Sequence, residues 1–297
     1  MKRIVLLDLA GGLGNQIFLF QAARFVASVY NNTILVNKSN IDKNHSKGTS
    51  TIDDFVFPKT VRFFQLTPTL NKGYTLIRNL LRKYNDSNLS FFFILDESYS
   101  TWDRDELHNL ILGKKPVVMI VCGFWQNLDY WDSDFNFKLK SESKKFLELS
   151  NEVKTLCPIV FHYRLGRLNN RWEHGWGALS PIFLSNALVS LSKNDTQLKN
   201  VWIFSNDLQE ARQLTASINC SPYQFVYIDD SELSPAELLI LLSLSKTLIC
   251  SNSTFSILAA RIGNASTVVV PSELSKNGHM CLALPNKWKK VNPVWLD

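Results

Sequence analysis

The sequence predicts an α/β fold of two Rossmann-like domains that face a central cleft. Short runs rich in β-branched and apolar residues alternate with longer helix-like patterns along most of the chain. A glycine-rich turn joins the first apolar run to the first helical pattern, which is typical of a βαβ unit with a parallel sheet. The alternation restarts after Pro158, so we place the domains at 1–155 and 156–297.

The first domain opens with the clearest βαβ pattern. Ile4–Leu7 is expected to form a strand, Gly11–Gly14 a tight loop, Asn15–Tyr30 an amphipathic helix and Thr33–Val36 the next strand. Further along, the segment from about 38 to 104 is rich in lysine, asparagine and serine and is expected to be irregular.

Two more elements close the first domain. Val117–Cys122 is expected to be a buried strand, and a helix is expected from about Glu142 to Val153. Because Pro158 follows this helix, the domain boundary is placed there.

The second domain alternates more regularly. Its expected strands are Ile159–His162, Val201–Phe204, Gln224–Ile228, Thr247–Cys250 and Thr267–Val270, and its expected helices are Pro181–Leu191, Leu208–Ala216, Pro235–Leu244 and Phe255–Arg261. This order predicts a doubly wound parallel sheet, in which ligands bind at the carboxyl ends of the strands.

The chain has an excess of positive charge. Of its 297 residues 45% are hydrophobic and 20% charged, with a formal net charge of +6, and its pI is near 9.0. This charge favours an anionic partner: nucleotide phosphates, a nucleic acid or an acidic membrane surface. The cations are dispersed and no recognition motif accompanies them, so nucleic-acid binding is not expected.

Neither a signal segment nor a membrane span is expected. Asp8 interrupts the first apolar run, and later apolar runs such as Val117–Trp125 are far shorter than the roughly 20 residues that cross a bilayer. The five cysteines are scattered without CxxC spacing, which suits a reducing cytoplasm and predicts neither a disulfide framework nor a zinc site.

The first candidate binding motif is the run Gly11-Gly12-Leu13-Gly14-Asn15-Gln16, directly after a strand and at the start of a helix. Its glycines allow a close approach of an anion to helix N-terminal amides. A dinucleotide fingerprint would need a third glycine where Ile17 stands, and an acidic residue near Val36. A nucleotide-dependent oxidoreductase is therefore the weaker alternative.

The second motif is the segment from Phe161 to Gly166, at the end of the first strand of the second domain. His162 and Arg164 are two residues apart and are expected on the same side of this strand. A guanidinium here could bind a diphosphate, whereas His162 could equally be a hydrogen-bonded core histidine.

The third and fourth motifs follow later strands. Asp207 could cap the next helix or accept hydrogen bonds from a guanine edge. The run Ser251-Asn252-Ser253-Thr254 could likewise cap a helix, or could hold a phosphate with its hydroxyls and the helix amides.

Taken in order, these motifs resemble the bacterial α-1,2-fucosyltransferases of glycosyltransferase family 11. The matching segments are Gly11–Gln16 with Phe18, Gly123–Gln126 with Tyr130, His162-x-Arg164-x-Gly166, Phe204–Asp207, and Ser251–Ser256 with Ala259 and Ala260. They cover the chain from about residue 4 to 262. The resemblance implies a GT-B-like fold, GDP-fucose as the donor, inversion at the anomeric carbon and no metal or other cofactor.

The resemblance also implies roles for particular residues. Arg164 would contact the diphosphate and stabilise the leaving group, His162 and Asp207 the guanosine, and Ser253 and Thr254 the phosphates, with Asn252 in the same donor-binding run. Gly12, Gly14 and Asn15 would close the site from the first domain. The acceptor would be a galactose-containing oligosaccharide or lipid-linked glycan of surface-polysaccharide (O-antigen) synthesis, reached by a cytoplasmic enzyme at the inner face of the membrane.

One residue departs from the family pattern. Arg167 stands where the family usually has aspartate after Gly166. The alternatives are an added positive charge toward the phosphates, or a non-catalytic or altered sugar-nucleotide-binding protein.

The general base and the acceptor side are open. Asp8 and Glu173 are positional candidates for the base, and His174 and Trp176 could line the acceptor side or belong to a surface loop. Two D-x-D triplets, at Asp103/Asp105 and Asp132/Asp134, are interpreted as solvated acidic clusters, because such short motifs arise by chance.

Overall fold

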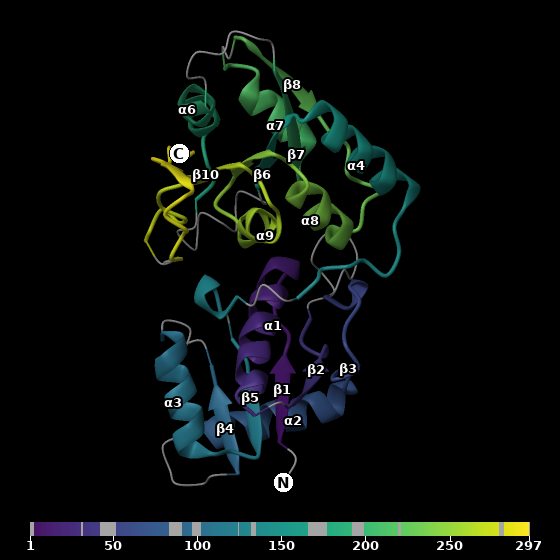
Figure 1. Ribbon diagram of the computed structural model, residues 1–297, viewed down its shortest axis with the longest axis vertical. Coiled ribbons are helices and arrows are strands. Elements are labelled where there is room, and N and C mark those ends of the chain that lie inside the picture. Colours follow the sequence, from purple (N-terminus) through teal and green to yellow (C-terminus); the bar gives the residue numbers. More distant parts are fainter. Residues whose placement is uncertain are drawn as a thin grey trace. The chain divides into compact units, whose positions relative to one another are not determined.

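The structure, a computed structural model, describes residues 3–30, 32–41, 52–82, 91–96, 102–123, 125–131, 135–165, 177–191, 199–218, 221–278 and 282–296. The chain forms two compact units, Met1–Lys140 and Ser141–Asp297. Each unit contains one parallel sheet covered by helices (Figure 1). The predicted α/β class with two Rossmann-like halves is confirmed.

The sheet of the first unit has the strand order β3-β2-β1-β5-β4. Its strands are β1 (Ile4–Asp8), β2 (Thr33–Asn37), β3 (Val61–Phe64), β4 (Phe92–Leu95) and β5 (Val118–Val121). All the pairings are parallel, with Ile4 opposite Thr33 on one side and Val118 on the other. The central strand β1 is thus the one that precedes the glycine-rich loop.

Helices of the first unit are α1 (Leu13–Ser28), α2 (Pro68–Arg82) and α3 (Arg104–Lys114), with the short 3-10 turns η1 (Ile52–Asp54) and η3 (Leu128–Tyr130). Most of α1 is buried, as expected for a helix that packs on the sheet. The prediction of irregular structure between 38 and 104 is wrong, because β3, α2 and β4 lie there. No residue of α2 is buried, whereas a helix that packs on a sheet usually buries an apolar face.

The sheet of the second unit has the order β11-β10-β9-β6-β7-β8. Its strands are β6 (Ile159–Tyr163), β7 (Lys199–Ser205), β8 (Tyr223–Tyr227), β9 (Thr247–Cys250), β10 (Thr267–Pro271) and β11 (Lys289–Val291). The five strands expected in this half are all present, and β11 is an addition at the edge.

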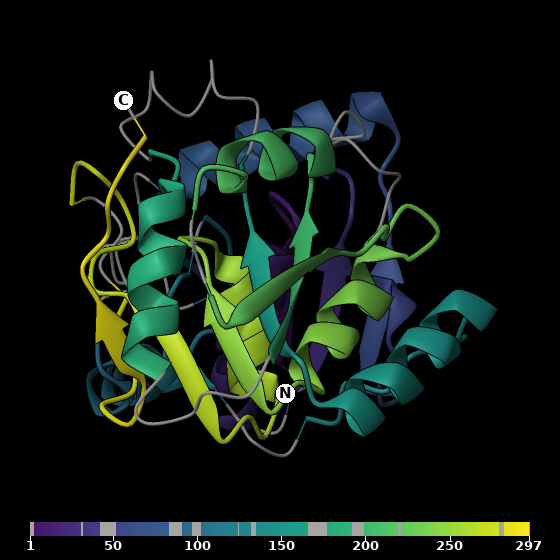
Figure 2. The same cartoon turned by 90° about the horizontal axis from the view of Figure 1, so that it is seen from above.

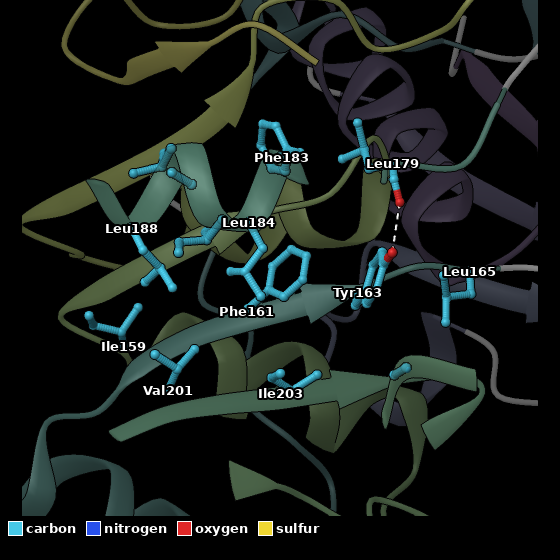
Figure 3. Packing of buried hydrophobic residues seen from close by; sticks show 14 residues of the cluster. Ile159, Phe161, Tyr163, Leu165, Leu179, Phe183, Leu184, Leu188, Val201 and Ile203 are labelled. Atoms are coloured by element: carbon cyan, nitrogen blue, oxygen red, sulfur yellow. Dashed lines mark hydrogen bonds between the residues drawn. The ribbon is translucent and has the colours of Figure 1, made fainter. Parts of the chain in front are cut away.

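Helices of the second unit are α4 (Lys144–Leu156), α6 (Pro181–Leu191), α7 (Leu208–Thr215), α8 (Pro235–Ser243) and α9 (Thr254–Ile262). Side chains of α6 and α7 pack on one face of β6 in a buried cluster that includes Phe161 and Tyr163 (Figure 3). Tyr163 donates its hydroxyl hydrogen bond to the carbonyl of Leu179, 2.7 Å away. The hydroxyl of Tyr163 therefore has a hydrogen-bond partner although it is buried. The face of β6 that carries Phe161 and Tyr163 is the one packed in the core.

The boundary between the units lies before α4, one helix earlier than the sequence-based boundary at 155/156. Helix α4 packs on α8 (Figure 2). The carboxylate of Glu237 in α8 accepts hydrogen bonds from the backbone N–H of Ser143, at 2.6 Å, and of Ser234, at 2.8 Å. A buried carboxylate that joins the starts of both helices ties α4 to the second unit.

Candidate functional site

The second sheet reverses its direction of growth at β6. From β6 the chain adds β7 and then β8 on one side, and it then places β9, β10 and β11 on the other. In an open parallel sheet this switch point leaves a crevice at the carboxyl ends of the two strands involved. The segments that follow β6 and β9 are therefore the first place to look for a ligand.

Strand β6 sends alternate side chains to opposite faces of the sheet. Tyr163 points into the core on the α6 side, whereas the ring of His162 lies 5.3 Å from the ring of Phe255 in α9. His162 is only 5% exposed. The two-residue period places Arg164 on the same side as His162, as predicted.

Arg164 is partly buried just beyond the end of β6. Burial lowers the pKa of its guanidinium, because removal from water disfavours the charged form. The backbone N–H of the next residue, Leu165, donates to Oδ1 of Asn206 at 3.0 Å. This bond holds the loop that carries Arg164 against the end of β7, a role for Asn206 that the sequence analysis missed.

Asp207 begins helix α7. Its Oδ1 accepts a hydrogen bond from the N–H of Glu210 at 3.0 Å, so it is the N-cap of this helix. The side chain is exposed. A capping role and a contact with a base edge use different oxygens, so the cap does not prevent the expected role in guanosine binding.

The segment after β9 turns tightly into helix α9. The carbonyl of Ser251 accepts from the N–H of Ser253 at 2.8 Å and from Oγ of Ser256 at 3.3 Å. Ser253 is the N-cap of α9, and its hydroxyl accepts from the N–H of Phe255 at 3.4 Å. Asn252 is almost fully buried, and its amide donates to the carbonyl of Gly177 at 3.1 Å. These hydrogen bonds fix the start of α9 just beyond the end of β9.

Two features make this corner suited to an anion. The amides of the first helical turn of α9, which begins at Thr254, face the carboxyl edge of the sheet, and helix N-termini attract negative charge. The hydroxyl of Ser251 is also buried and has no hydrogen-bond partner within the described residues. A ligand oxygen would relieve the cost of such a hydroxyl.

The strand register puts these groups at one level. His162 is opposite Phe204 of β7 and Cys250 of β9. Arg164, Asn206 and Asn252 are each two residues further along, and Asp207, Ser253 and Thr254 follow directly. The structure thus brings together the donor-site residues predicted in the second unit.

In the first unit, the glycine loop leads from β1 into α1. Gly11 has a positive φ of 70°, which favours glycine, and its carbonyl accepts from Nε2 of Gln16 at 3.0 Å. Gly12 is the N-cap of α1, and a Cβ there would meet nothing within 4 Å. Packing against the residues that the structure describes therefore gives no reason for glycine at this position. A ligand that approaches the backbone would.

The loop is tied to its surroundings by two amide side chains. Oε1 of Gln16 accepts from the N–H of Ile52 at 3.0 Å, and Oδ1 of Asn15 accepts from Nε2 of Gln126 at 3.2 Å. Gly14 is buried in the first turn of α1. Gln16 and Gln126 are supporting residues to which the sequence analysis gave no role.

Asp8, a positional candidate for the general base, ends β1. Its carboxylate accepts hydrogen bonds from Nδ2 of Asn37 at 3.0 Å, from the hydroxyl of Tyr74 at 2.9 Å and from the guanidinium of Arg78 at 2.8 Å. The Asp8 side chain is 3% exposed. Burial and the Asp8 charge raise the pKa of Tyr74. A carboxylate held by three donors is poorly placed to take a proton from a substrate.

Several sequence-predicted residues lie outside the described residues: Gly166, Arg167, Glu173, His174 and Trp176, and the second acidic triplet, Asp132 and Asp134. The first triplet is described, and its Asp103 forms a capping box with Glu106 at the start of α3. Among the described residues, no group of three or more histidine, cysteine, aspartate or glutamate side chains could hold a metal ion.

Comparison with known proteins shows the fold. FUT1 of Arabidopsis thaliana, in a mutant form in complex with GDP, superposes with a TM-score of 0.51 at 14% identity, over 91% of this chain and 70% of that chain. Fucosyltransferase NodZ from Bradyrhizobium gives 0.52 at 14% identity, over 89% and 94%. A glycosyl transferase family 9 structure from Veillonella parvula gives 0.50 at 8% identity, over 98% and 86%.

No family model matches the sequence, and no curated protein matches it. The architecture is nevertheless the GT-B-like one that the motif resemblance implied.

Proposed function

We propose that this chain is a glycosyltransferase that takes its sugar from a nucleotide sugar. The observation that carries the proposal is the switch point of the second sheet, where Arg164 follows β6 and α9 begins just after the neighbouring strand β9. Burial lowers the pKa of the Arg164 guanidinium, so a bound anion would stabilise its charged form. The amides at the start of α9 would donate further hydrogen bonds to that anion. A nucleoside diphosphate has the charge and length to bind both.

The donor that we propose is GDP-fucose. The ordered motifs resemble α-1,2-fucosyltransferases, and one of the similar structures is NodZ, an α-1,6-fucosyltransferase soaked with GDP-fucose. His162 and Asp207 would then face the guanosine, with Arg164 on the diphosphate and Ser253 and Thr254 on the phosphates. For Gly12, Gly14 and Asn15 of the first unit, the donor-binding role implied by the motif resemblance stays a prediction.

The reaction would proceed with inversion. The bond between fucose C1 and the GDP oxygen breaks as the 2-hydroxyl oxygen of an acceptor galactose bonds to C1 from the opposite face. The hydroxyl proton passes to a general base, and GDP leaves with the bonding pair. Because negative charge grows on the diphosphate, Arg164 and the α9 amides would stabilise the transition state most. No metal is needed in this scheme, so activity should persist in a chelator.

The general base is better sought outside Asp8. The three hydrogen bonds that Asp8 accepts make it part of the first unit's framework. Glu173 is the remaining carboxylate candidate, with His174 and Trp176 on the acceptor side. Glu173→Gln should lower kcat and leave GDP affinity unchanged, because a base acts on the acceptor hydroxyl and not on the nucleotide.

The test is GDP release from GDP-fucose with a panel of galactose-terminated acceptors, together with the linkage of the product. The wild-type chain should release GDP only with a suitable acceptor and form an α-1,2 bond. Arg164→Ala should lower kcat/KM by about a hundredfold to a thousandfold. Arg212→Ala is the matched control, since that arginine is exposed in α7 and stacks on Tyr227.

The outcomes separate the alternatives. GDP-fucose binding without turnover on any acceptor would indicate a non-catalytic binding protein, which Arg167 leaves open. Binding of NAD in place of GDP would indicate an oxidoreductase. Normal turnover in Arg164→Ala would overturn the assignment of the site.

A further inference from the structure

Helix α2 of the first unit has its apolar face turned to solvent. Its side chains at Leu70, Leu76, Ile77 and Leu80 are 61%, 63%, 58% and 48% exposed. At 100° per residue these four positions fall on one side of the helix. A surface helix normally buries its apolar side, so this one is reversed.

The opposite side of α2 holds the helix on the sheet, by polar contacts and by Leu81, which packs against the cluster of Ile94, Ile120 and Cys122. Asn71 donates to Asn40, which follows β2, Arg78 pairs with Asp8 at the end of β1, and Arg82 pairs with Asp96 just after β4. Its anchors thus lie just after β2, at the end of β1 and just after β4. These polar anchors fix the orientation of α2 and keep the four apolar side chains of its exposed face turned outward.

The segment that contains α2 is basic. Between residues 55 and 85 there are six lysines and arginines and no aspartate or glutamate. Lys72 is exposed on α2. Lys59, just before β3, and Arg62, within β3, are exposed as well. Arg78 and Arg82 are paired with Asp8 and Asp96, so among the described residues the positive charge that the segment presents to solvent comes from Lys59, Arg62 and Lys72.

We propose that this face of α2 binds the surface of an anionic lipid membrane. An amphipathic helix with low overall hydrophobicity and neighbouring cations can lie in the headgroup region with its apolar side inserted. Each lysine or arginine near an anionic leaflet adds attraction. Within the described chain no helix has the length and apolarity of a membrane span, so the contact is with the surface. This inference stands apart from the proposed activity, because it needs no nucleotide.

The experiment is co-sedimentation of the full chain with vesicles, without nucleotide. The wild-type chain should bind phosphatidylcholine vesicles that contain about 30% phosphatidylglycerol, and should bind pure phosphatidylcholine at least about tenfold more weakly. Leu76→Gln with Ile77→Gln should weaken binding about tenfold or more by removing inserted apolar area. Glutamine keeps helix propensity, so folding should be retained.

A matched control uses two similarly exposed residues of α6, Ile182 and Val189, which are 54% and 68% exposed. Ile182→Gln with Val189→Gln should leave vesicle binding unchanged. Lys72→Glu should weaken binding in low salt and lose most of that effect in high salt. Thermal unfolding of every variant checks the fold.

Three results would overturn the proposal: no vesicle binding by the wild-type chain, equal loss in the α6 control, or a dimer that dissociates in the α2 variant. The last would show that a second copy covers the face. Because GDP binding is measured separately, a wild-type chain that binds GDP but no vesicles would count against the membrane contact alone.

Discussion

The two sheets have central strands that end in opposite charges. In the first unit β1 ends in Asp8, which is met by Asn37, Tyr74 and Arg78 from the same unit. In the second unit β6 is followed by Arg164, whose pKa is lowered by burial. Both residues stand at a switch point of a parallel sheet, because β1 and β6 each have strands added on both sides.

The comparison sets a charge that is neutralised within the fold beside one that is a candidate for ligand binding. The Asp8 carboxylate is neutralised by a guanidinium 2.8 Å away, so its charge serves the fold. Burial of Arg164 disfavours its charged form, and an anionic ligand would reverse that effect. Position in the fold is therefore a poor guide to role until the partners of the charge are known.

The largest effect is expected from Arg164→Ala. Binding of GDP should weaken about a hundredfold, because a charge-assisted, two-point contact with the diphosphate is lost. Isothermal titration with GDP measures it. Arg164→Lys keeps the charge without the fork and should give an intermediate affinity. Arg164→Ala should leave the free energy of unfolding nearly unchanged. A loss of about 3 kcal/mol, the size expected below for Asp8→Asn, would make Arg164 a structural residue.

A smaller effect is expected from Asp8→Asn, and it should fall on stability instead of on GDP affinity. The change leaves the half-buried Arg78 without its counter-charge, which should lower the free energy of unfolding by about 3 kcal/mol. Urea unfolding followed by circular dichroism measures it. Affinity for GDP in the second unit should stay within about twofold. Asp103→Ala, which removes an exposed helix cap, should cost about 1 kcal/mol and serves as the control.

The sequence was informative where contacts are local. The strands around Arg164 and the start of α9 could be predicted because apolar runs, N-cap residues and helical periods all occur within short windows. The start of α1 at Leu13, which includes Gly14 and Asn15, was close to the expected one.

The remainder depends on contacts between distant residues. Helix α2 was missed because none of its residues is fully buried and most of its contacts with the sheet are polar and made to distant residues. The partners of Asp8 lie 66 and 70 residues away at Tyr74 and Arg78, so no local window reveals that Asp8 is held. Glu237 of α8 accepts a hydrogen bond from the N–H of Ser143, 94 residues away, so no local window reveals that α4 packs with the second unit.

Glu237 extends the comparison to a buried carboxylate in the second unit. Burial raises its pKa, but the hydrogen bonds from Ser143 and Ser234 outweigh this and leave the pKa below its ordinary value. A lowered folded-state pKa stabilises the fold above the unfolded value, near 4.3, and this stability is lost as pH falls through the folded value. Glu237→Gln should therefore cost about 1–2 kcal/mol at pH 7.

The cost of Glu237→Gln should shrink as the pH is lowered below about 4, because the wild-type carboxyl is then protonated as well. Urea midpoints between neutral and acidic pH measure it. A cost that does not change with pH would show that the side chain acts by its shape and not by its charge.

The smallest effect is expected from Ser253→Ala, at the start of α9. Loss of the cap should cost about 1 kcal/mol of stability, and loss of a phosphate donor should weaken GDP binding about fivefold to tenfold. Ser234→Ala is the matched control, because Ser234 is the N-cap of α8 and is absent from the ordered donor motifs. It should show the stability loss alone. Equal effects on GDP affinity in both variants would mean that Ser253 only caps α9, and would leave Arg164 to hold the diphosphate with the backbone amides.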